Sequence, residues 1–405
     1  MAITKITTPE LFNLQSNNTE GTRLPVMTTT QRNAMTSMSN GELIFNSTTD
    51  SVEYYDLGAA AWYKIDYDPL ENFNTVLYTG NGSAQTLNVS TIGFQPDLVW
   101  LKQRTGSLAN HLVADTVRGP WKIIYPNIIY SSDRTSVDKA ITSFADGFTV
   151  KDTTQGTYEC NGPNGGTYSG NGTYVAWCFK AGGAAVANTN GSINSQVSVN
   201  DTLGFSIAKY TGNTTSGATV GHGLSSTPEL ILFKTLESGP GYAGWAVQVA
   251  SLGGDKYLIL NESQQAYSGT GYFNDTLADS DVITLGSFDV TNDGTDIIAY
   301  SFASKPGFSK VGTYTGNGGN NPVDVGFEPA FVMIKNTTSS ASWAMFDNKR
   351  TTANPSTSAL YANEAIIEED LQLYFEFTST GFKNLQSSNT LNTSSSIYIY
   401  LAFAK

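Results

Sequence analysis

The sequence has few charged residues, few cysteines and few histidines. Charged side chains make up 14% of the 405 residues, well below the roughly 25% of an average soluble domain. Two cysteines, Cys160 and Cys178, exclude a disulfide-rich scaffold, and so few in so long a chain indicate assembly in a reducing compartment. The two could still pair with each other, whereas the run YVAWCFKA predicts Cys178 to be a small buried apolar residue.

Long apolar runs are also missing. No stretch approaches the ~20 apolar residues of a membrane-spanning helix, so membrane insertion is not expected. The opening MAITKITTPELFNLQ is too polar for a secretion signal. Acidic residues outnumber basic ones by 35 to 22, which gives a net charge of −13. A surface of this sign repels phosphate, so nucleic acid is not an expected partner.

The residues that replace the missing charges are typical of β structure. The chain has 39 Gly, 21 Tyr and 20 Phe, together with many Thr, Ser and Asn. Aromatic residues and Thr favour strands, and Asn and Gly favour the turns between them. The composition therefore predicts an all-β protein with many turns.

The tetrapeptide YTGN occurs three times, at residues 78–81, 210–213 and 314–317. Downstream of each copy, a proline is followed by a short apolar run that ends in lysine: GFQPDLVWLK, TPELILFK and GFEPAFVMIK. Because proline is tolerated at the first position of a strand, each run predicts the start of a buried strand. A structural unit explains such copying better than an active-site motif does.

The match extends well beyond these runs. His111, Trp245 and Trp343 share one position, and Asn127, Asn261 and Asn363 share another. The first and third copies also share an Asp and an Arg, which we interpret as ion pairs or turn-fixing contacts: Asp115 with Arg118, and Asp347 with Arg350, replaced by Val249 and Leu252 in the second copy. Each copy ends on an aromatic strand: YVAWCFKA, IIAYSFAS and YIYLAFAK.

These matches define three segments, 74–182, 201–306 and 307–405, each of about 100 residues. Short strands separated by turn residues predict a jelly-roll-like β-sandwich for each segment. Residues 183–200, rich in Gly, Ala and Asn, predict a linker. Because each segment is large enough for its own core, we expect beads on a string rather than a solenoid.

Residues 1–68 lie outside the repeat and predict a small β module. Thr28 and Gln31 are spaced as a helix capping box, and GELIFNSTTDSVEYYD predicts a hairpin that turns at 46–50. AAWYKI would add a third strand. Three strands are marginally stable alone, so this module is expected to attach to another domain or to copies of itself.

Motifs for catalysis are missing, and no catalytic, cofactor-binding or metal-binding residue is expected. His111 and His222 are the only histidines, and no GxSxG, GxGxxG or P-loop pattern occurs. We interpret His222 as a solvated turn residue, and the acidic cluster Glu368, Glu369 and Asp370 as a solvated face or turn. Trp245, Trp343 and His111 are candidates for ligand contact, with sugar stacking for the tryptophans and a place in the core as the alternative.

The N-terminal stretch RLPVMTTTQRNAM…GELIFNSTTDSVEYYD…AWYKI resembles a module of tailed-bacteriophage virion proteins, chiefly tail fibres and other appendages. The pattern YTGNG…GFQPDLVWLKQRTG, with its second and third copies, resembles a repeat of tailed phages, particularly those of marine bacteria. The resemblance implies a structural virion protein, assembled in the host cytoplasm, that forms a trimer and contacts other virion proteins.

The resulting hypothesis is a non-enzymatic, tail-fibre-like appendage. It would be anchored by residues 1–68 and would contact the host surface, including its glycans, through the three segments. A decoration or cement protein that binds only other virion proteins is the alternative. A polysaccharide depolymerase is a minor one, because it needs converging acids that the repeat pattern lacks.

Overall fold

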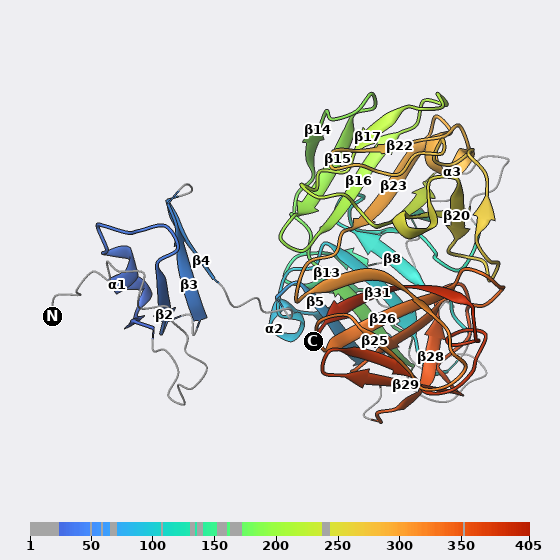
Figure 1. Cartoon of the computed structure of the whole chain (residues 1–405). Coiled ribbons are helices and arrows are strands. Elements are labelled where there is room, and N and C mark those ends of the chain that lie inside the picture. Colours follow the sequence, from blue (N-terminus) through green and yellow to red (C-terminus); the bar gives the residue numbers. More distant parts are fainter. Residues whose placement is uncertain are drawn as a thin grey trace. The chain divides into compact units, whose positions relative to one another are not determined.

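The computed structural model describes residues 24–48, 51–57, 60–64, 71–106, 108–129, 134–135, 141–151, 160–162, 172–236, 244–350 and 353–405. The chain divides into two units, Met1–Tyr67 and Asp68–Lys405, both drawn in Figure 1. Both are built almost wholly of strands, which confirms the all-β class.

The N-terminal unit is one four-stranded sheet with a short helix. The sheet order is β1-β2-β3-β4, in which β1 runs parallel to β2. The capping box is confirmed, because the backbone N–H of Gln31 donates to Thr28 Oγ1 and the N–H of Thr28 donates to Gln31 Oε1. The hairpin and the third strand are confirmed as well. The elements are β1 (Val26–Met27), α1 (Thr29–Asn33), β2 (Leu43–Asn46), β3 (Ser51–Asp56) and β4 (Ala61–Lys64).

The described part of this unit has a small core. Among its described residues the buried apolar side chains are Met27, Ile44 and Tyr55. Two polar side chains, Asn46 and Glu53, are buried beside them. Glu53 accepts from Arg32 Nη1 at 2.7 Å and from Asn46 Nδ2 at 2.9 Å. The described strands alone bury too little apolar surface for an independently stable domain.

The second unit contains three main sheets, one from each segment, and all three have the same strand order. The strand that leads into YTGN lies beside the last strand of its segment, and the strand after the proline follows. In the first segment the order is β5 (Phe73–Thr79), β13 (Thr173–Phe179), β7 (Leu98–Gln103), β8 (Leu112–Asp115). In the second it is β16 (Phe205–Thr211), β23 (Asp296–Phe302), β18 (Leu230–Thr235), β19 (Trp245–Val249). In the third it is β24 (Ser309–Thr315), β31 (Ile397–Ala404), β26 (Pro329–Asn336), β27 (Ala344–Asp347).

A smaller layer of strands packs on one face of each main sheet and encloses a core with it. In the first segment this layer is β6 (Gln85–Leu87), β12 (Phe148–Val150) and β11 (Ile141–Ser143). In the second it is β17 (Thr219–Gly221) and β22 (Val282–Thr284). In the third it is β25 (Asn321–Asp324), β30 (Gly381–Asn384) and β29 (Glu369–Thr378).

Shorter elements complete the second unit. They are α2 (Val89–Ile92), β9 (Lys122–Ile123), β10 (Arg134–Thr135), β14 (Val186–Asn188), β15 (Ser195–Asn200), the 3-10 turn Ala250–Leu252, β20 (Lys256–Ile259), β21 (Tyr267–Ser268), α3 (Asp289–Asn292) and β28 (Ser356–Tyr361). The prediction of a linker over 183–200 is wrong, because β14 and β15 add two strands to the edge of the second main sheet. Ile193 and Val197 in this stretch are buried, which ties it to the fold.

The three segments are not beads on a string, because their main sheets also pack against one another (Figure 1). The three equivalent rings of Phe179, Phe302 and Phe403 meet with centroids 5.3 to 6.2 Å apart. Strands such as β7 and β18 are therefore buried at every position. At the centre the apolar side chains leave a cavity of about 20 Å³, which is roughly the space of one water molecule.

The YTGN motif fastens the first strand of each segment to the loop before its last strand. The tyrosine hydroxyls donate to the backbone carbonyls of Cys160, Thr291 and Leu391. The residue after each carbonyl is an asparagine whose Oδ1 accepts from the backbone N–H of the motif's asparagine. The motif's glycine is needed for this approach, since a Cβ on Gly316 would lie 2.1 Å from the carbonyl oxygen of Thr393. The tetrapeptide therefore has a structural role, because it bonds the first strand of each segment to the residues that precede the last strand.

Replacing one ring of the central cluster tests whether the second unit unfolds as a whole. We expect Phe302→Ala, at a side chain 4% exposed, to cost about 3–5 kcal/mol of unfolding free energy. Because the segments share this core, tryptophan fluorescence from the first and third segments should be lost in the same denaturant transition. Leu108→Ala, at a side chain 70% exposed, is the control and should change stability by no more than about 0.5 kcal/mol. Separate transitions for the segments would contradict a shared core.

Candidate functional site

The three aligned residues singled out from the sequence are His111, Trp245 and Trp343, and all lie inside the second unit, no more than 1% exposed. Each sits at the start of the fourth strand of its main sheet. Its backbone N–H donates to the side-chain oxygen of the aligned asparagine, at 2.9, 2.8 and 2.8 Å for Asn127, Asn261 and Asn363.

The ring nitrogens of these residues bond across the contacts between segments. Trp245 Nε1 donates to the carbonyl of Tyr125 at 2.8 Å, and Trp343 Nε1 donates to that of Ile259 at 3.2 Å. His111 Nε2 lies 2.9 Å from the carbonyl oxygen of Tyr361. The second segment thus bonds to the first, the third to the second, and the first to the third. This closed cycle lies inside the core. A place in the core is the alternative to ligand contact that the sequence analysis left open for these three residues.

His111 differs from the two tryptophans in having a second partner. Trp100 Nε1 donates to its Nδ1 at 2.9 Å, so the proton of the neutral ring is on Nε2, facing the carbonyl of Tyr361. Burial holds the pKa of His111 well below 6.5, and the nearby charge of Lys102 lowers it further. The ring is therefore a fixed hydrogen-bonding group rather than a proton carrier at neutral pH.

The lysines at the ends of the apolar runs make a second set of contacts between segments. Lys102 Nζ donates to the carbonyl of Ala109 at 2.8 Å and, in the third segment, to that of Ala365 at 3.1 Å. Lys335 donates to the carbonyl of Ser263 in the second segment at 2.8 Å and to that of Ala341. Burial lowers the pKa of Lys335 to about 7. These lysines are engaged in holding the fold.

The shared Asp and Arg residues are ion pairs, as predicted. Asp115 lies 2.6 Å from Arg118 Nε, and Asp347 lies 2.5 Å from Arg350 Nε. Each carboxylate also accepts from a neighbouring segment: Tyr300 Oη donates to Asp115 at 2.7 Å, and Trp177 Nε1 donates to Asp347 at 3.1 Å. In the second segment Val249 stands at the position of the carboxylate. In the third segment Leu401 stands at the position of the donors Tyr300 and Trp177. Acceptor and donor are therefore lost together.

Two sequence interpretations are wrong because their partners lie far away in the chain. His222 is fully buried, and its Nε2 lies 3.2 Å from the carbonyl oxygen of Asp279. Glu368 is not solvated, since its carboxylate lies 2.6 Å from Arg104 Nε of the first segment and 3.5 Å from Arg350 Nη1. Glu369 and Asp370 begin β29, and their side chains lie outside the described residues.

Both cysteines are buried thiols and are not joined in a disulfide. Cys178 packs in the core of the first segment, as its sequence context predicts. Within the ranges that the structure describes, no three His, Cys, Asp or Glu side chains gather as metal ligands. No helix in those ranges is long and apolar enough to cross a membrane.

A surface pocket in the second segment was missed from the sequence. It measures about 130 Å³ and is lined by Tyr257, Tyr267 and Tyr272, together with Glu262, Ile129, Gly244 and Ile259. The signal that could have found it is the spacing of the three tyrosines in KYLILNESQQAYSGTGYF, just after the aligned tryptophan.

The second unit coincides with a known family. The family model described as a domain of unknown function, DUF7483, matches residues 68–405, and the chain therefore belongs to this family. The match treats the three segments as one domain, in agreement with their common core.

A second family model, described as a phage tail like trimerisation region, matches residues 4–82. This match supports a structural protein of the phage-tail type, a component of the virion, and a trimeric assembly. No curated protein and no solved structure gave a significant match.

The pairing of Trp100 with His111 can be tested by making the first segment resemble the second, which has Leu232 and Trp245 at these positions. We expect His111→Trp alone to cost about 1–3 kcal/mol, because Trp100 Nε1 loses its acceptor and a larger ring is forced in. Adding Trp100→Leu should recover most of this loss. A double-mutant cycle by chemical denaturation measures the coupling. Additive effects of the two substitutions would contradict the pairing.

The buried histidines should make the protein less stable in mild acid. The pKa values of His111 and His222 are both lowered in the folded state. As pH falls through 6.5, the unfolded chain gains protons that the folded chain does not, so the unfolding free energy should fall by up to about 1.4 kcal/mol per histidine for each pH unit. Denaturation at pH 7 and pH 5 measures this change. The slope should be smaller in the double variant with His111→Trp and Trp100→Leu, and an equal slope would contradict the assignment.

Proposed function

We propose that the protein is a non-enzymatic structural part of a phage tail appendage. In this proposal the N-terminal unit joins three chains and attaches them to the particle. The DUF7483 unit projects from it and contacts the host surface. The observation that carries the proposal is the match of a phage tail like trimerisation region to residues 4–82.

The N-terminal unit supports the role of a joining element. Among its described residues the buried apolar side chains, Met27, Ile44 and Tyr55, are few for an independent domain, while Val26 is 68% exposed and Leu57 57% exposed. Association with two further copies would give these apolar groups partners. The partly buried pair of Arg32 and Glu53 would give the subunit a defined shape before it assembles.

The engagement of the polar groups supports a structural rather than a catalytic role. The histidines, the two Asp–Arg pairs and the buried lysines are held by contacts within the chain, many of them between segments. A catalytic acid or base must be able to reach a substrate. Groups that hold segments together inside a core do not meet that condition.

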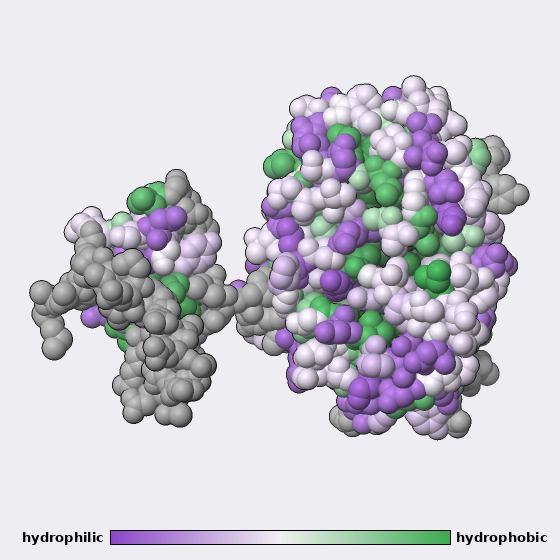
Figure 2. Space-filling model, in the orientation of Figure 1, coloured by the Kyte–Doolittle hydropathy of each residue, from purple (hydrophilic) through white to green (hydrophobic). Residues whose placement is uncertain are grey.

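The surface of the DUF7483 unit suits exposure to solvent. Figure 2 shows that the visible face of this unit is mainly hydrophilic or neutral, with small separate hydrophobic patches. A unit buried among capsid or tail-tube subunits would be expected to present a larger continuous apolar area. The face that Figure 2 shows has no such area, which supports host contact over a role as a cement protein.

Mass measurement tests the trimer. We expect the full chain in solution to have three times the mass of the 43.4 kDa monomer by light scattering. Ile44→Asp places a charge in the core of the N-terminal unit and should give monomers whose DUF7483 unit is still folded. Leu108→Asp, on the surface of the second unit, is the control and should remain trimeric. A monomeric wild-type chain, or a trimeric Ile44→Asp variant, would count against the proposal.

The position on the particle tests the appendage. A cryo-EM reconstruction of the virion should show the N-terminal unit at the tail and the DUF7483 unit free of other virion proteins. If the DUF7483 unit instead lies packed along capsid or tail-tube subunits, the protein is a decoration or cement protein and the host-contact proposal fails.

A further inference from the structure

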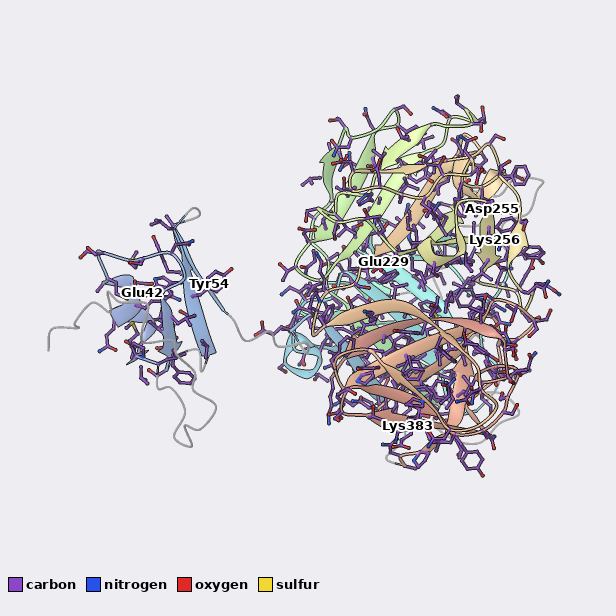
Figure 3. All side chains as sticks on the ribbon, viewed as in Figure 1. Glu42, Tyr54, Glu229, Asp255, Lys256 and Lys383 are labelled. Atoms are coloured by element: carbon purple, nitrogen blue, oxygen red, sulfur yellow. The ribbon has the colours of Figure 1, made fainter. Side chains whose placement is uncertain are left out.

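The second segment carries a group of three tyrosines that has no counterpart at the aligned positions described in the other segments. Tyr257 on β20 lies opposite Tyr267 on β21, with ring centroids 5.3 Å apart and planes 19° apart. Tyr272, in the turn that follows, meets Tyr257 edge to face at 4.5 Å. All three side chains are partly exposed. Asp255 and Lys256, labelled in Figure 3, mark the outer end of β20, where this group begins.

Tyr257 packs against the core of the second segment, but the repeat does not require an aromatic side chain at this position. The position of Tyr257 is Ile123 in the first segment and Ala359 in the third, and both of those side chains are fully buried. An aliphatic side chain is therefore sufficient to close the core at this point. The second segment replaces it with an aromatic residue that remains partly exposed, which indicates a role at the surface.

A carboxylate completes the group. Glu262 Oε2 accepts from the hydroxyl of Tyr267 at 2.8 Å, and both residues line the pocket of about 130 Å³. Among the described residues, no group donates a hydrogen bond to Glu262 Oε1. Burial, together with the hydrogen bond to Glu262, raises the pKa of Tyr267 to about 12, and burial raises that of Tyr272 to about 12. The phenols therefore keep their protons. Because Tyr267 donates its one O–H to Glu262, Tyr257 and Tyr272 are the two that can donate to a ligand.

The pocket combines apolar ring surface with several polar groups at the surface, in a space that can receive part of a sugar ring while the rest stays in solvent. A cavity of about 150 Å³ holds a benzene molecule, and the tyrosine pocket is slightly smaller. Tyrosine faces cover apolar C–H surface, while hydroxyls and a carboxylate satisfy the hydroxyls of a ligand. A net charge of −13 disfavours an acidic ligand.

We propose that the pocket formed by Tyr257, Tyr267, Tyr272 and Glu262 binds one neutral or amino-bearing pyranose ring of a carbohydrate. A tyrosine face would pack against the C–H face of the sugar, and the Glu262 carboxylate would accept hydrogen bonds from its hydroxyls. The biological meaning of this site rests on the proposed host contact, but the binding itself does not.

Ligand-observed NMR on the full-length protein tests this site directly. The probes are the methyl glycosides of glucose, galactose, mannose and N-acetylglucosamine. We expect saturation transfer to at least one of them, with an affinity reduced at least tenfold by Tyr257→Ala and by Glu262→Gln. Glu262→Gln keeps the shape of the side chain, so it remains informative if Tyr257→Ala fails to fold.

Two matched controls separate the pocket from other surfaces. Glu364→Gln changes the glutamate at the same position of the third segment, where Ala359 replaces the tyrosine, and Tyr374→Ala removes a tyrosine 38% exposed elsewhere. Both should bind the sugar as the wild type does. No transfer to any of the four glycosides, binding that survives Glu262→Gln, or preferential binding of tetramethylammonium would each overturn the proposal. Sugar binding by a protein that reconstruction places among capsid subunits would leave the pocket valid and would refute only the host contact.

Discussion

The second unit depends on the burial of both faces of its main sheets. One face of each sheet packs on the smaller layer of its own segment, and the other face packs on the main sheets of the other two segments. The rings of Phe179, Phe302 and Phe403 lie where the three second faces meet. Because both faces are covered, little of the main sheets reaches solvent, and this accounts in part for a charged fraction of 14%.

Polar groups inside this shared interior come with their partners. The acceptor for the ring N–H of Trp245 is a carbonyl of the first segment, and the acceptor for Trp343 is one of the second. Where the carboxylate is replaced by Val249, the donor position is occupied by Leu401. A buried donor without an acceptor costs more than the loss of both groups, so the segments have diverged in matched positions. The three contacts between neighbouring segments thus have the same geometry but different side-chain chemistry.

Local features of the fold could be predicted from the sequence. The capping box of Thr28, the hairpin after it and the Asp–Arg pairs depend on residues close in the chain, and all are present. The packing of the segments could not be predicted, because it depends on contacts such as that of Arg104 with Glu368. One signal was nevertheless available: runs such as LVWLK and LILFK do not alternate, as a strand with one solvated face would. The same limit applied to the candidate site residues. Trp245 and Trp343 lie in the core, and their ring N–H groups bond to carbonyls far away in the chain.

The head-to-tail direction of the contacts between segments has a consequence for how such a gene can change. Each segment donates to one neighbour and accepts from the other, and the cycle closes after the third. An open array of repeats can lose or gain a unit by recombination and still fold. Here a deletion or duplication of one segment would leave a row of donors and an apolar sheet face without partners. We therefore expect the copy number to be fixed at three, and we expect sequence change to be tolerated mainly in the loops and at surface positions such as Tyr257.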